Sequence, residues 1–365
     1  MDEDKVVRVL QVTGLITKNS LPMNYYRRID RNKVQFDFLL HKESDCADEI
    51  SSMGGNVYVM PRRFPNYPKH LRWLNEFFKN NRRYDVVHQN TGNSLAISVS
   101  MYAKKHGAKK RIYHSHGSKS DRSIIGAVHD VFYKKKISKY ATHYFACSDM
   151  AADHVFGKYI DKSEIKIINN GVDTEVFGFN THVREKKRQE LGIDDKFVIG
   201  HVGRLSPEKN HQFIVAFFSE IYNRNKDAVL LLVGDGKLRG TIEKNVRELG
   251  LEHKVIFAGD CLDVAEYLCA MDVFVFPSLY EGLPLALVEA QANGLHCLAS
   301  DNISRQAAIT DLLEYLPLTE SAMIWADRIL SFADGYERKD MRGAIKRAGF
   351  DITEVVNWLE EFYTD

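Results

Sequence analysis

The sequence lacks several features that mark secreted and membrane-spanning proteins. Its five cysteines are odd in number, scattered along the chain and free of any Cys-x-x-Cys pair. This pattern argues against a disulfide framework or a zinc site and favours reduced thiols in a cytoplasmic protein. No stretch approaches the roughly 20 apolar residues that a membrane-spanning helix needs. Since the chain opens on MDEDK and passes directly into an apolar run, we expect no signal peptide.

Net charge is also nearly absent, at +1, but the charges are unevenly distributed. Lysine and arginine dominate the first half, with clusters at 104–111 and 134–139, whereas aspartate and glutamate dominate the second half. Solvated helix faces would explain such clusters, and so would a surface that meets an anionic partner. Because no nucleic-acid-binding motif is present, we expect this partner to be an anionic membrane, at the inner face of the plasma membrane, rather than nucleic acid.

The chain alternates between short apolar runs and helical patterns, with no internal repeat. Its 365 residues are enough for two domains. Strand patterns occur at 6–12, 34–40, 56–60, 84–88, 110–114, 143–147 and 165–168, and again at 197–202, 228–233, 254–257, 272–276 and 296–299. This alternation is typical of an α/β protein with doubly wound parallel sheets.

We therefore predict two facing Rossmann-like domains with the active site between them. The first domain is predicted at 1–172 and the second at 173–348. The last segment, 349–365, reads as a helix with Val355, Trp358, Leu359 and Phe362 on one face. An apolar helix face must be covered, so we expect this helix to pack back against the first domain.

The stretch at 271–293, MDVFVFPSLYEGLPLALVEAQAN, organises the second domain. A buried strand at 272–276 is followed by a turn that carries Glu281, and then by a helix with Pro284 in its first turn and Glu289 two turns in. Ligands of open α/β sheets bind beyond the carboxyl ends of the strands, and helix N-termini favour anions there. An anion would repel the two carboxylates, so Glu281 and Glu289 are expected to accept hydrogen bonds from neutral hydroxyls. Phosphate and hydroxyls together suggest a nucleotide sugar.

A second motif, GRLSPEKN at 203–210, follows a strand and opens a helix predicted at 209–224. Gly203 would let a ligand approach the backbone. Arg204 offers bidentate contacts to a phosphate and Lys209 a point charge. A surface turn ahead of a helix is the plainer interpretation of the octapeptide alone. We interpret Gly234-Asp235-Gly236, after the next strand, as a structural turn.

The octapeptide and the Glu281-x7-Glu289 pair, in this order, resemble the retaining glycosyltransferases of the GT-B fold. The resemblance is to the large family 4 (glycosyl transferases group 1), and within it to bacterial capsular and exopolysaccharide enzymes. It covers nearly the whole chain. It implies a nucleoside-diphosphate sugar as donor, with a UDP-sugar expected, and no metal ion or other cofactor. It also implies transfer with retention by a front-face route, in which the leaving phosphate helps to deprotonate the acceptor hydroxyl.

The resemblance also assigns roles to residues of the second domain. Arg204 and Lys209 would hold the diphosphate and stabilise charge on the leaving group. Glu281 would bind hydroxyls of the transferred sugar, and Glu289 those of the ribose. The backbone amides of residues near the start of the helix would face the sugar and phosphate. These residues are Gly282, Leu283 and Leu285.

In the first domain, His116 matches a histidine that contacts the donor sugar near the reacting carbon in the family. His114, two residues earlier, is interpreted as a structural histidine. A metal site formed by His114 and His116 is not expected, because no carboxylate lies nearby in the sequence. After the first strand the family carries a Gly-Gly-x-Glu-like loop, of which only Gly14 is kept in a shortened form. Gly14 would still allow close backbone approach to the donor. Gly171 is expected to supply a turn between the domains.

We predict a cytoplasmic glycosyltransferase that acts on a lipid-linked or saccharide acceptor in bacterial capsule or exopolysaccharide biosynthesis, with peripheral contact to an anionic membrane. Two alternatives stay open. The protein could bind nucleotide sugars without catalysis because its first loop is degenerate. It could also transfer the sugar to a soluble small acceptor, in which case the basic clusters would serve an anionic acceptor.

Overall fold

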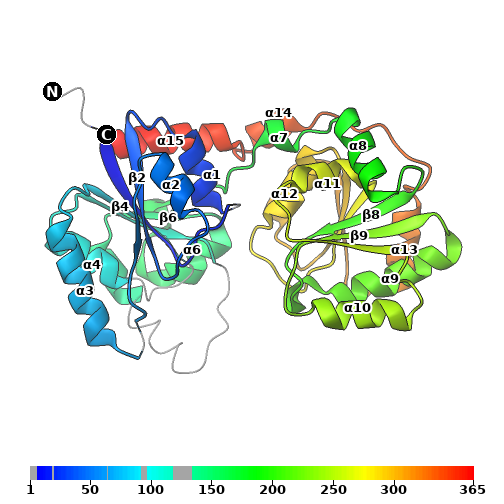
Figure 1. Ribbon diagram of the computed structural model, residues 1–365, viewed down its shortest axis with the longest axis horizontal. Coiled ribbons are helices and arrows are strands. Elements are labelled where there is room, and N and C mark those ends of the chain that lie inside the picture. The colour runs from blue at the N-terminus through cyan, green and yellow to red at the C-terminus, as the bar shows by residue number, and fades with distance from the viewer. Residues whose placement is uncertain (1–5, 19, 64, 92–96, 118–133) are drawn as a thin grey trace. The chain divides into compact units, whose positions relative to one another are not determined.

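The computed structural model describes residues 6–18, 20–63, 65–91, 97–117 and 134–365. The chain divides into two compact units, Met1–Gly171 with Ile352–Asp365, and Val172–Asp351. Each unit is built on its own parallel sheet with helices on both faces (Figure 1). The predicted boundaries of 172/173 and 348/349 differ from these divisions by one and three residues.

The first unit contains a seven-stranded parallel sheet in the order β3-β2-β1-β4-β5-β6-β7. The order reverses between β1 and β4, so these strands flank the switch point of the sheet. Central strands of such a sheet are covered on both faces, and all seven residues of β2 are buried. The strands are β1 (Val7–Val12), β2 (Val34–Leu40), β3 (Val57–Val59), β4 (Val86–Thr91), β5 (Lys110–Ser115), β6 (His143–Ala146) and β7 (Ile165–Ile167).

Two groups of helices cover this sheet. On one face lie α1 (Leu21–Arg28), α2 (Ala47–Ser52) and α15 (Ile352–Thr364), and on the other α3 (Tyr67–Asn80), α4 (Ile97–Lys105) and α6 (Asp149–Val155). Residues 134–140 are also helical, while most of the basic helix predicted at 124–139 lies outside the described residues.

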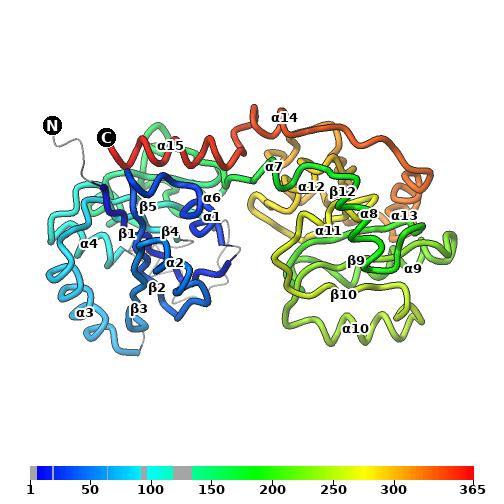
Figure 2. Tube along the Cα trace, turned by 45° about the horizontal axis from the view of Figure 1, so that its top comes forward, coloured from blue at the N-terminus to red at the C-terminus, as the bar shows by residue number. Residues whose placement is uncertain are grey.

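The C-terminal helix is an integral part of the first unit, as the sequence indicated. Figures 1 and 2 show α15 beside α1 over the sheet. Val355, Val356, Leu359 and Tyr363 are buried in the same apolar cluster as Val9 of β1. Gly171 lies against the start of this helix, where a Cβ would come within 2.7 Å of the Cα of Ile352. Close approach to α15, rather than a positive φ, therefore explains this glycine.

The second unit contains a six-stranded parallel sheet in the order β10-β9-β8-β11-β12-β13, which reverses between β8 and β11. Its strands are β8 (Phe197–Val202), β9 (Ala228–Val233), β10 (Val255–Gly259), β11 (Val273–Phe276), β12 (His296–Ser300) and β13 (Leu313–Leu316). Its helices are α7 (Thr174–Phe177), α8 (Thr181–Leu191), α9 (His211–Arg224), α10 (Arg239–Glu248), α11 (Val264–Ala270), α12 (Leu285–Ala292), α13 (Ala322–Leu330) and α14 (Arg342–Arg347).

Several elements of the second unit were not predicted, and α8 shows why. In the sequence, residues 184–190 are recognisable only as a charged segment after the expected domain boundary, yet they lie within this helix. The Lys187 side chain is only 8% exposed and pairs with Asp263 and Glu266, while Arg188 pairs with Asp272 at 2.5 Å. Charged side chains replace the usual apolar face here, so hydrophobic periodicity gives no signal.

Candidate functional site

The loop that follows β8 carries the predicted motif at 203–210. Hydrogen bonds from Gly203 N to Val233 O (2.9 Å) and from Leu205 N to Asp235 O (3.0 Å) fasten it to the end of β9. The predicted helix 209–224 begins later, at His211. Lys209 ends a short 3₁₀ turn, and Asn210 has a φ of +57° that separates this turn from α9.

The loop that follows β11 lies directly beside the motif, because β8 and β11 are neighbours in the sheet. Leu279 N donates to Glu208 O at 2.8 Å, and the Asn210 amide donates to Pro277 O at 3.2 Å. These bonds join the two loops beyond the carboxyl ends of the strands at the switch point, where open α/β sheets bind ligands.

Lys209 and Glu281, one from each loop, form an ion pair in this structure. Lys209 Nζ lies 2.7 Å from Glu281 Oε1, and the two side chains are only 14% and 19% exposed. The ammonium also lies 4.4 Å from the centre of the Phe276 ring. Apart from this ion pair, buried Glu281 Oε1 has no hydrogen-bond partner among the described residues. The pair therefore has acceptor and donor capacity left for a ligand.

Arg204 differs from Lys209 in having no such partner. It is exposed, and its guanidinium forms no hydrogen bond or ion pair within the described ranges. The carboxylate of Glu208 senses the charge of Arg204 and accepts a 2.5 Å hydrogen bond from Ser206 Oγ. Arg204 is thus available to an anion at this edge of the sheet.

Glu289 is the fifth residue of α12, a little more than one turn into the helix rather than two. The residue is partly exposed, yet the crowding of protein atoms around its carboxyl raises the pKa to about 7. The side chain has no hydrogen bond or ion pair in the described part of the chain. A carboxyl in this environment can serve both as donor and as acceptor near neutral pH.

The start of α12 carries the remaining predicted positions of the second unit. Gly282 and Leu283 lie in the turn before the helix and Leu285 is its first residue, all three partly exposed. Pro284, predicted in the first turn, is instead the N-cap. The first amides of a helix lack intrahelical partners, so those at the start of α12 can bind a ligand.

In the first unit, Gly14 follows β1 and His116 follows β5, two strands that are separated by β4. Gly14, just after β1, is exposed, and a Cβ built on it would meet nothing within 4 Å, so the fold itself does not require glycine there. His116 follows β5, and its Nε2 lies 3.0 Å from Asn90 Oδ1. Burial lowers the pKa of His116 to about 4, with a hydrogen bond to Asn170 as a smaller opposing effect.

The sequence analysis missed several residues linked to His116. They are Gln11, His88 and Asn90 on the central strands and Tyr363 on α15. A signal was present, since the strand at 86–91 ends in four polar residues, HQNT, and the strand at 7–12 has Gln11 next to its last residue. The hydrogen bonds of Tyr363 to Gln11 and His88 could not have been predicted from the spacing of residues in the sequence.

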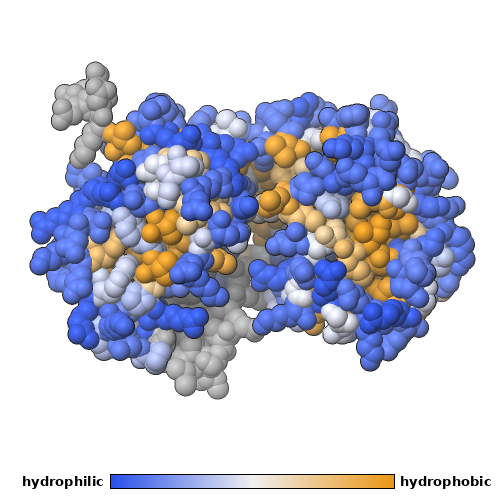
Figure 3. Space-filling model, viewed as in Figure 1, coloured by the Kyte–Doolittle hydropathy of each residue, from blue (hydrophilic) through white to orange (hydrophobic). Residues whose placement is uncertain are grey.

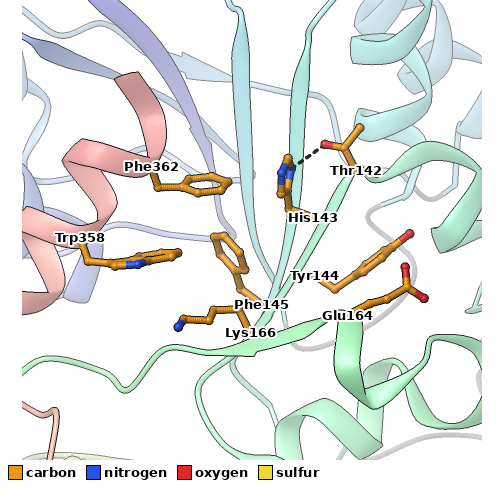
Figure 4. Close-up of a pocket in the computed structure, with 8 residues that line it drawn as sticks. All are labelled: Thr142, His143, Tyr144, Phe145, Glu164, Lys166, Trp358 and Phe362. Atoms are coloured by element: carbon orange, nitrogen blue, oxygen red, sulfur yellow. Dashed lines mark hydrogen bonds between the residues drawn. The ribbon is translucent and has the colours of Figure 1, made fainter. Parts of the chain in front are cut away.

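The pocket outlined in the structure does not coincide with these residues. Among the described residues, no three His, Cys, Asp or Glu side chains gather closely enough to hold a metal ion. A pocket of about 270 Å³ opens in the first unit between β6, β7 and α15 (Figure 4). Thr142 and Glu164, which directly precede β6 and β7, line it, so it lies toward the amino ends of these strands, away from His116.

The basic clusters are partly structural. Lys104 and Lys110 donate to the carbonyls of Lys139 and Phe362 at 2.8 and 2.5 Å, and Arg111 binds the carbonyl of Tyr140. Lys109, in contrast, is 81% exposed. The surface in Figure 3 is mainly hydrophilic, with scattered apolar patches. No helix in the described part of the chain is long and apolar enough to cross a membrane.

Two Rossmann-like parallel sheets in one chain, with the basic and acidic loops at the switch point of the second, define the GT-B class of glycosyltransferases. Comparison with known families agrees. The family model "Glycosyltransferase Family 4" matches residues 23–176, and "Glycosyl transferases group 1" matches residues 183–347. The chain belongs to the group 1, family 4 glycosyltransferases.

Individual relatives match along almost the entire chain. EpsF of Bacillus subtilis (strain 168) is 32% identical over 99% of this chain and 96% of its own length. A UDP-Gal:alpha-D-GlcNAc-diphosphoundecaprenol alpha-1,3-galactosyltransferase of Escherichia coli is 27% identical over 91% of this chain and 89% of that protein. HepE of Anabaena, solved with UDP-glucose, superposes with a TM-score of 0.78 at 20% identity, covering 97% of this chain and 98% of that one. The last likeness shows the fold.

Proposed function

We propose that the protein transfers a sugar from a UDP-sugar to a lipid-linked or saccharide acceptor, with retention of configuration, in bacterial exopolysaccharide or capsule biosynthesis. The observation that carries the proposal is the ion pair between Lys209 and Glu281, together with the exposed Arg204, at the carboxyl ends of β8 and β11. The pair supplies a cation for phosphate and an anion for hydroxyls, the two chemistries of a nucleotide sugar.

In the proposed reaction the donor competes with this internal ion pair. The diphosphate takes Lys209 and Arg204 as its counterions, and Glu281, released from Lys209, accepts hydrogen bonds from hydroxyls of the sugar. Glu289 binds the ribose, and the amides of Gly282, Leu283 and Leu285 face the sugar and phosphates. As the glycosidic bond breaks, negative charge grows on the departing diphosphate, and cations fixed beside it lower that barrier.

The remaining parts of the proposal rest on the family and on its relatives. His116 and Gly14 are assigned to the same reaction from the first unit. The UDP donor is supported by the UDP-glucose complex of HepE and by the donor in the name of the E. coli relative. That name also includes a diphosphoundecaprenol acceptor, which supports a lipid-linked acceptor and work at the inner face of the membrane. No metal or other cofactor is proposed.

Nucleotide binding is the first test. A ligand that binds only the folded state raises the melting temperature, so the purified chain is heated with UDP, GDP, ADP and their sugars at millimolar concentration. We expect stabilisation by UDP and UDP-sugars that is lost in Lys209→Ala. Absence of a shift with every nucleotide, in folded protein, would contradict the donor site.

Turnover is the second test. UDP-sugars are incubated with a polyprenyl-diphosphate saccharide in anionic vesicles and, separately, with soluble saccharides. Transfer in the vesicles, with an α-linked product from an α-linked donor in the proton spectrum, supports the proposal. Transfer only to soluble acceptors would favour the soluble-acceptor enzyme, and binding without transfer or hydrolysis would favour a non-catalytic protein.

A further inference from the structure

Polar side chains line the carboxyl-terminal end of one face of the first sheet. On β1, β4 and β5 this face is apolar at the amino end, with Val9, Val86 and Ile112 in the same core cluster. Two residues further along each strand it becomes polar, since side chains two positions apart share a face. The polar positions are Gln11 on β1, His88 and Asn90 on β4, and His114 on β5, with His116 directly after it.

One chain of hydrogen bonds leads from His116 to the C-terminal helix through two amides. His116 Nε2 lies 3.0 Å from Asn90 Oδ1, Asn90 Nδ2 donates to Gln11 Oε1 at 2.8 Å, and Gln11 Nε2 donates to the Tyr363 hydroxyl at 3.3 Å. An amide oxygen only accepts. His116 must therefore carry its proton on Nε2, which leaves the lone pair on Nδ1.

A second chain leads from the same hydroxyl through two histidines. The Tyr363 hydroxyl lies 2.6 Å from His88 Nδ1, and His88 Nε2 lies 3.0 Å from His114 Nδ1. The hydroxyl can donate its single proton to His88 Nδ1 while it accepts from Gln11. In this arrangement His88 donates from Nε2, and His114 carries its proton on Nε2 as well. The ring of His114 lies 4.0 Å from that of His116, between centroids.

In this arrangement His88 and His114 each accept through Nδ1, and burial keeps all three histidines neutral. Burial lowers the pKa of His88 to about 3 and of His116 to about 4, and it lowers the pKa of His114 well below its usual value. Each ring then has one donor and one acceptor, and its tautomer depends on its partner.

The end of α15 is held in place by packing and hydrogen bonding, which fixes the position of Tyr363 in this network. Trp358 and Phe362 stack on each other and meet Phe145 of β6 edge-on, with ring centroids 5.6 and 5.2 Å away (Figure 4). Lys110 donates to the carbonyl of Phe362 at 2.5 Å. Tyr363, the next residue, is 2% exposed and faces the sheet.

We propose that Tyr363 is a positioning residue, whose hydroxyl fixes the tautomers of the buried histidines and so presents Nδ1 of His116 as an acceptor for a ligand hydroxyl. The role rests on the proposed function, because it requires a sugar-bearing ligand at His116. It makes the C-terminal helix part of the site chemically, beyond its contribution to the core.

Ring-nitrogen NMR spectra of the full chain test the network without any need for activity. The wild type should show neutral histidines protonated on Nε2 for His88, His114 and His116, each assigned from its His→Gln variant. Tyr363→Phe removes the hydroxyl at constant ring volume and should turn the signals of His88 and His114 into tautomer mixtures. Because the amide chain also ends on this hydroxyl, Tyr363→Phe should change the His116 signal too, whereas Gln11→Met cuts only the amide chain and should release His116 alone.

Tyr26→Phe is the matched control. Tyr26 is equally buried in the same core cluster, and its hydroxyl binds the Met53 carbonyl, outside the network. It should lower the melting temperature without changing the three histidine patterns. Unchanged patterns in Tyr363→Phe, or the same changes in Tyr26→Phe, would overturn the network.

Kinetics then test the positioning role. We expect Tyr363→Phe to lower kcat about tenfold, as for a misplaced reacting group, while the KM for the UDP-sugar changes less than about twofold. A kcat equal to that of Tyr26→Phe would overturn the role even if the tautomers change. Failure of the proposed function would show itself separately, as the absence of transfer by the wild type.

Discussion

At the scale of single residues, the second unit keeps a cation and an anion partly buried against each other. Desolvated charges are costly unless paired, and Lys209 and Glu281 pair at 2.7 Å. Removal of either residue would leave the other as a partly buried charge without its partner. A donor with a negative diphosphate and neutral hydroxyls can satisfy both groups at once, whereas a free sugar cannot replace the partner of Lys209.

Lys209→Ala should lower kcat/KM for the UDP-sugar about a hundredfold, because one charge-stabilising group is lost. The expected change is mainly in kcat. The control is Lys244→Ala, which removes a lysine that is 71% exposed on α10 and pairs with Glu248. Steady-state kinetics at saturating acceptor measure both variants, and equal rates for the two would contradict the assigned role.

Glu289 predicts a dependence of stability on pH. Its pKa in the folded protein, about 7, lies above the ordinary value of 4.5, so the folded state binds the proton more tightly than the unfolded state. The free energy of unfolding should therefore fall as pH rises from 4.5 to 7, because the stabilisation of the protonated form is lost.

Glu289→Gln removes this titration. Its stability relative to the wild type should rise with pH over that window, by on the order of 1–2 kcal/mol for a partly exposed site. Denaturant unfolding at pH 5, 6, 7 and 8 gives the difference. Glu248→Gln, an exposed carboxylate, should show no such trend, and a constant difference for Glu289→Gln would refute the prediction.

At the scale of elements, the loop after β8 depends on glycines where backbones nearly touch. Gly234, after β9, has a φ of +125°, and a Cβ there would lie 2.2 Å from Gly203 O. Gly236 is equally close to Leu205 O, at 2.4 Å. The turn at 234–236 thus supports the loop that carries Arg204 and Lys209, in agreement with its interpretation as structural.

Gly234→Ala should destabilise the second unit by about 2 kcal/mol or more, because it combines strained backbone with overpacking. It should also weaken UDP binding by displacing Gly203. Gly240→Ala on α10 is the counterpart, since nothing lies within 4 Å of its Cβ and alanine favours a helix by up to about 1 kcal/mol. Thermal unfolding with and without UDP compares the two variants. Similar melting temperatures would show that the backbone at Gly203 moves away from the added Cβ at little cost in free energy.

At the scale of the whole molecule, the chain crosses between the units twice, and α15 completes the first unit from the far end of the sequence. Each apolar side chain buried by α15 contributes about 1.5–3 kcal/mol. Together they are comparable to the roughly 5–15 kcal/mol that stabilise a typical domain. The buried apolar residues of α15 are Ile352, Val355, Val356 and Leu359.

A chain that ends at Asp351 should therefore lose the cooperative unfolding of the first unit. The second unit, Val172–Asp351, contains its whole sheet and should unfold as before and still be stabilised by UDP. Calorimetry of the full and shortened chains resolves the two transitions. Retention of both transitions in the shortened chain would show that α15 is dispensable to the first core.

The sequence by itself determined the α/β class, most strands and the two motifs at 203–210 and 281–289. Buried parallel strands are continuous apolar runs, and each motif is contiguous, so its strand and loop come from neighbouring residues. The site roles of these residues stay predictions. The family is shown by the comparisons, which agree with the resemblance.

Tertiary structure decided what depends on residues far apart in the chain. Strand order set Lys209 against Glu281, a buried ion-pair network made α8 a helix, and crowding raised the pKa of Glu289. Tyr363 meets His88 across 275 positions. Alternation of strands and helices does not specify which strands are neighbours or where a terminal helix packs, and proton positions follow from those contacts alone.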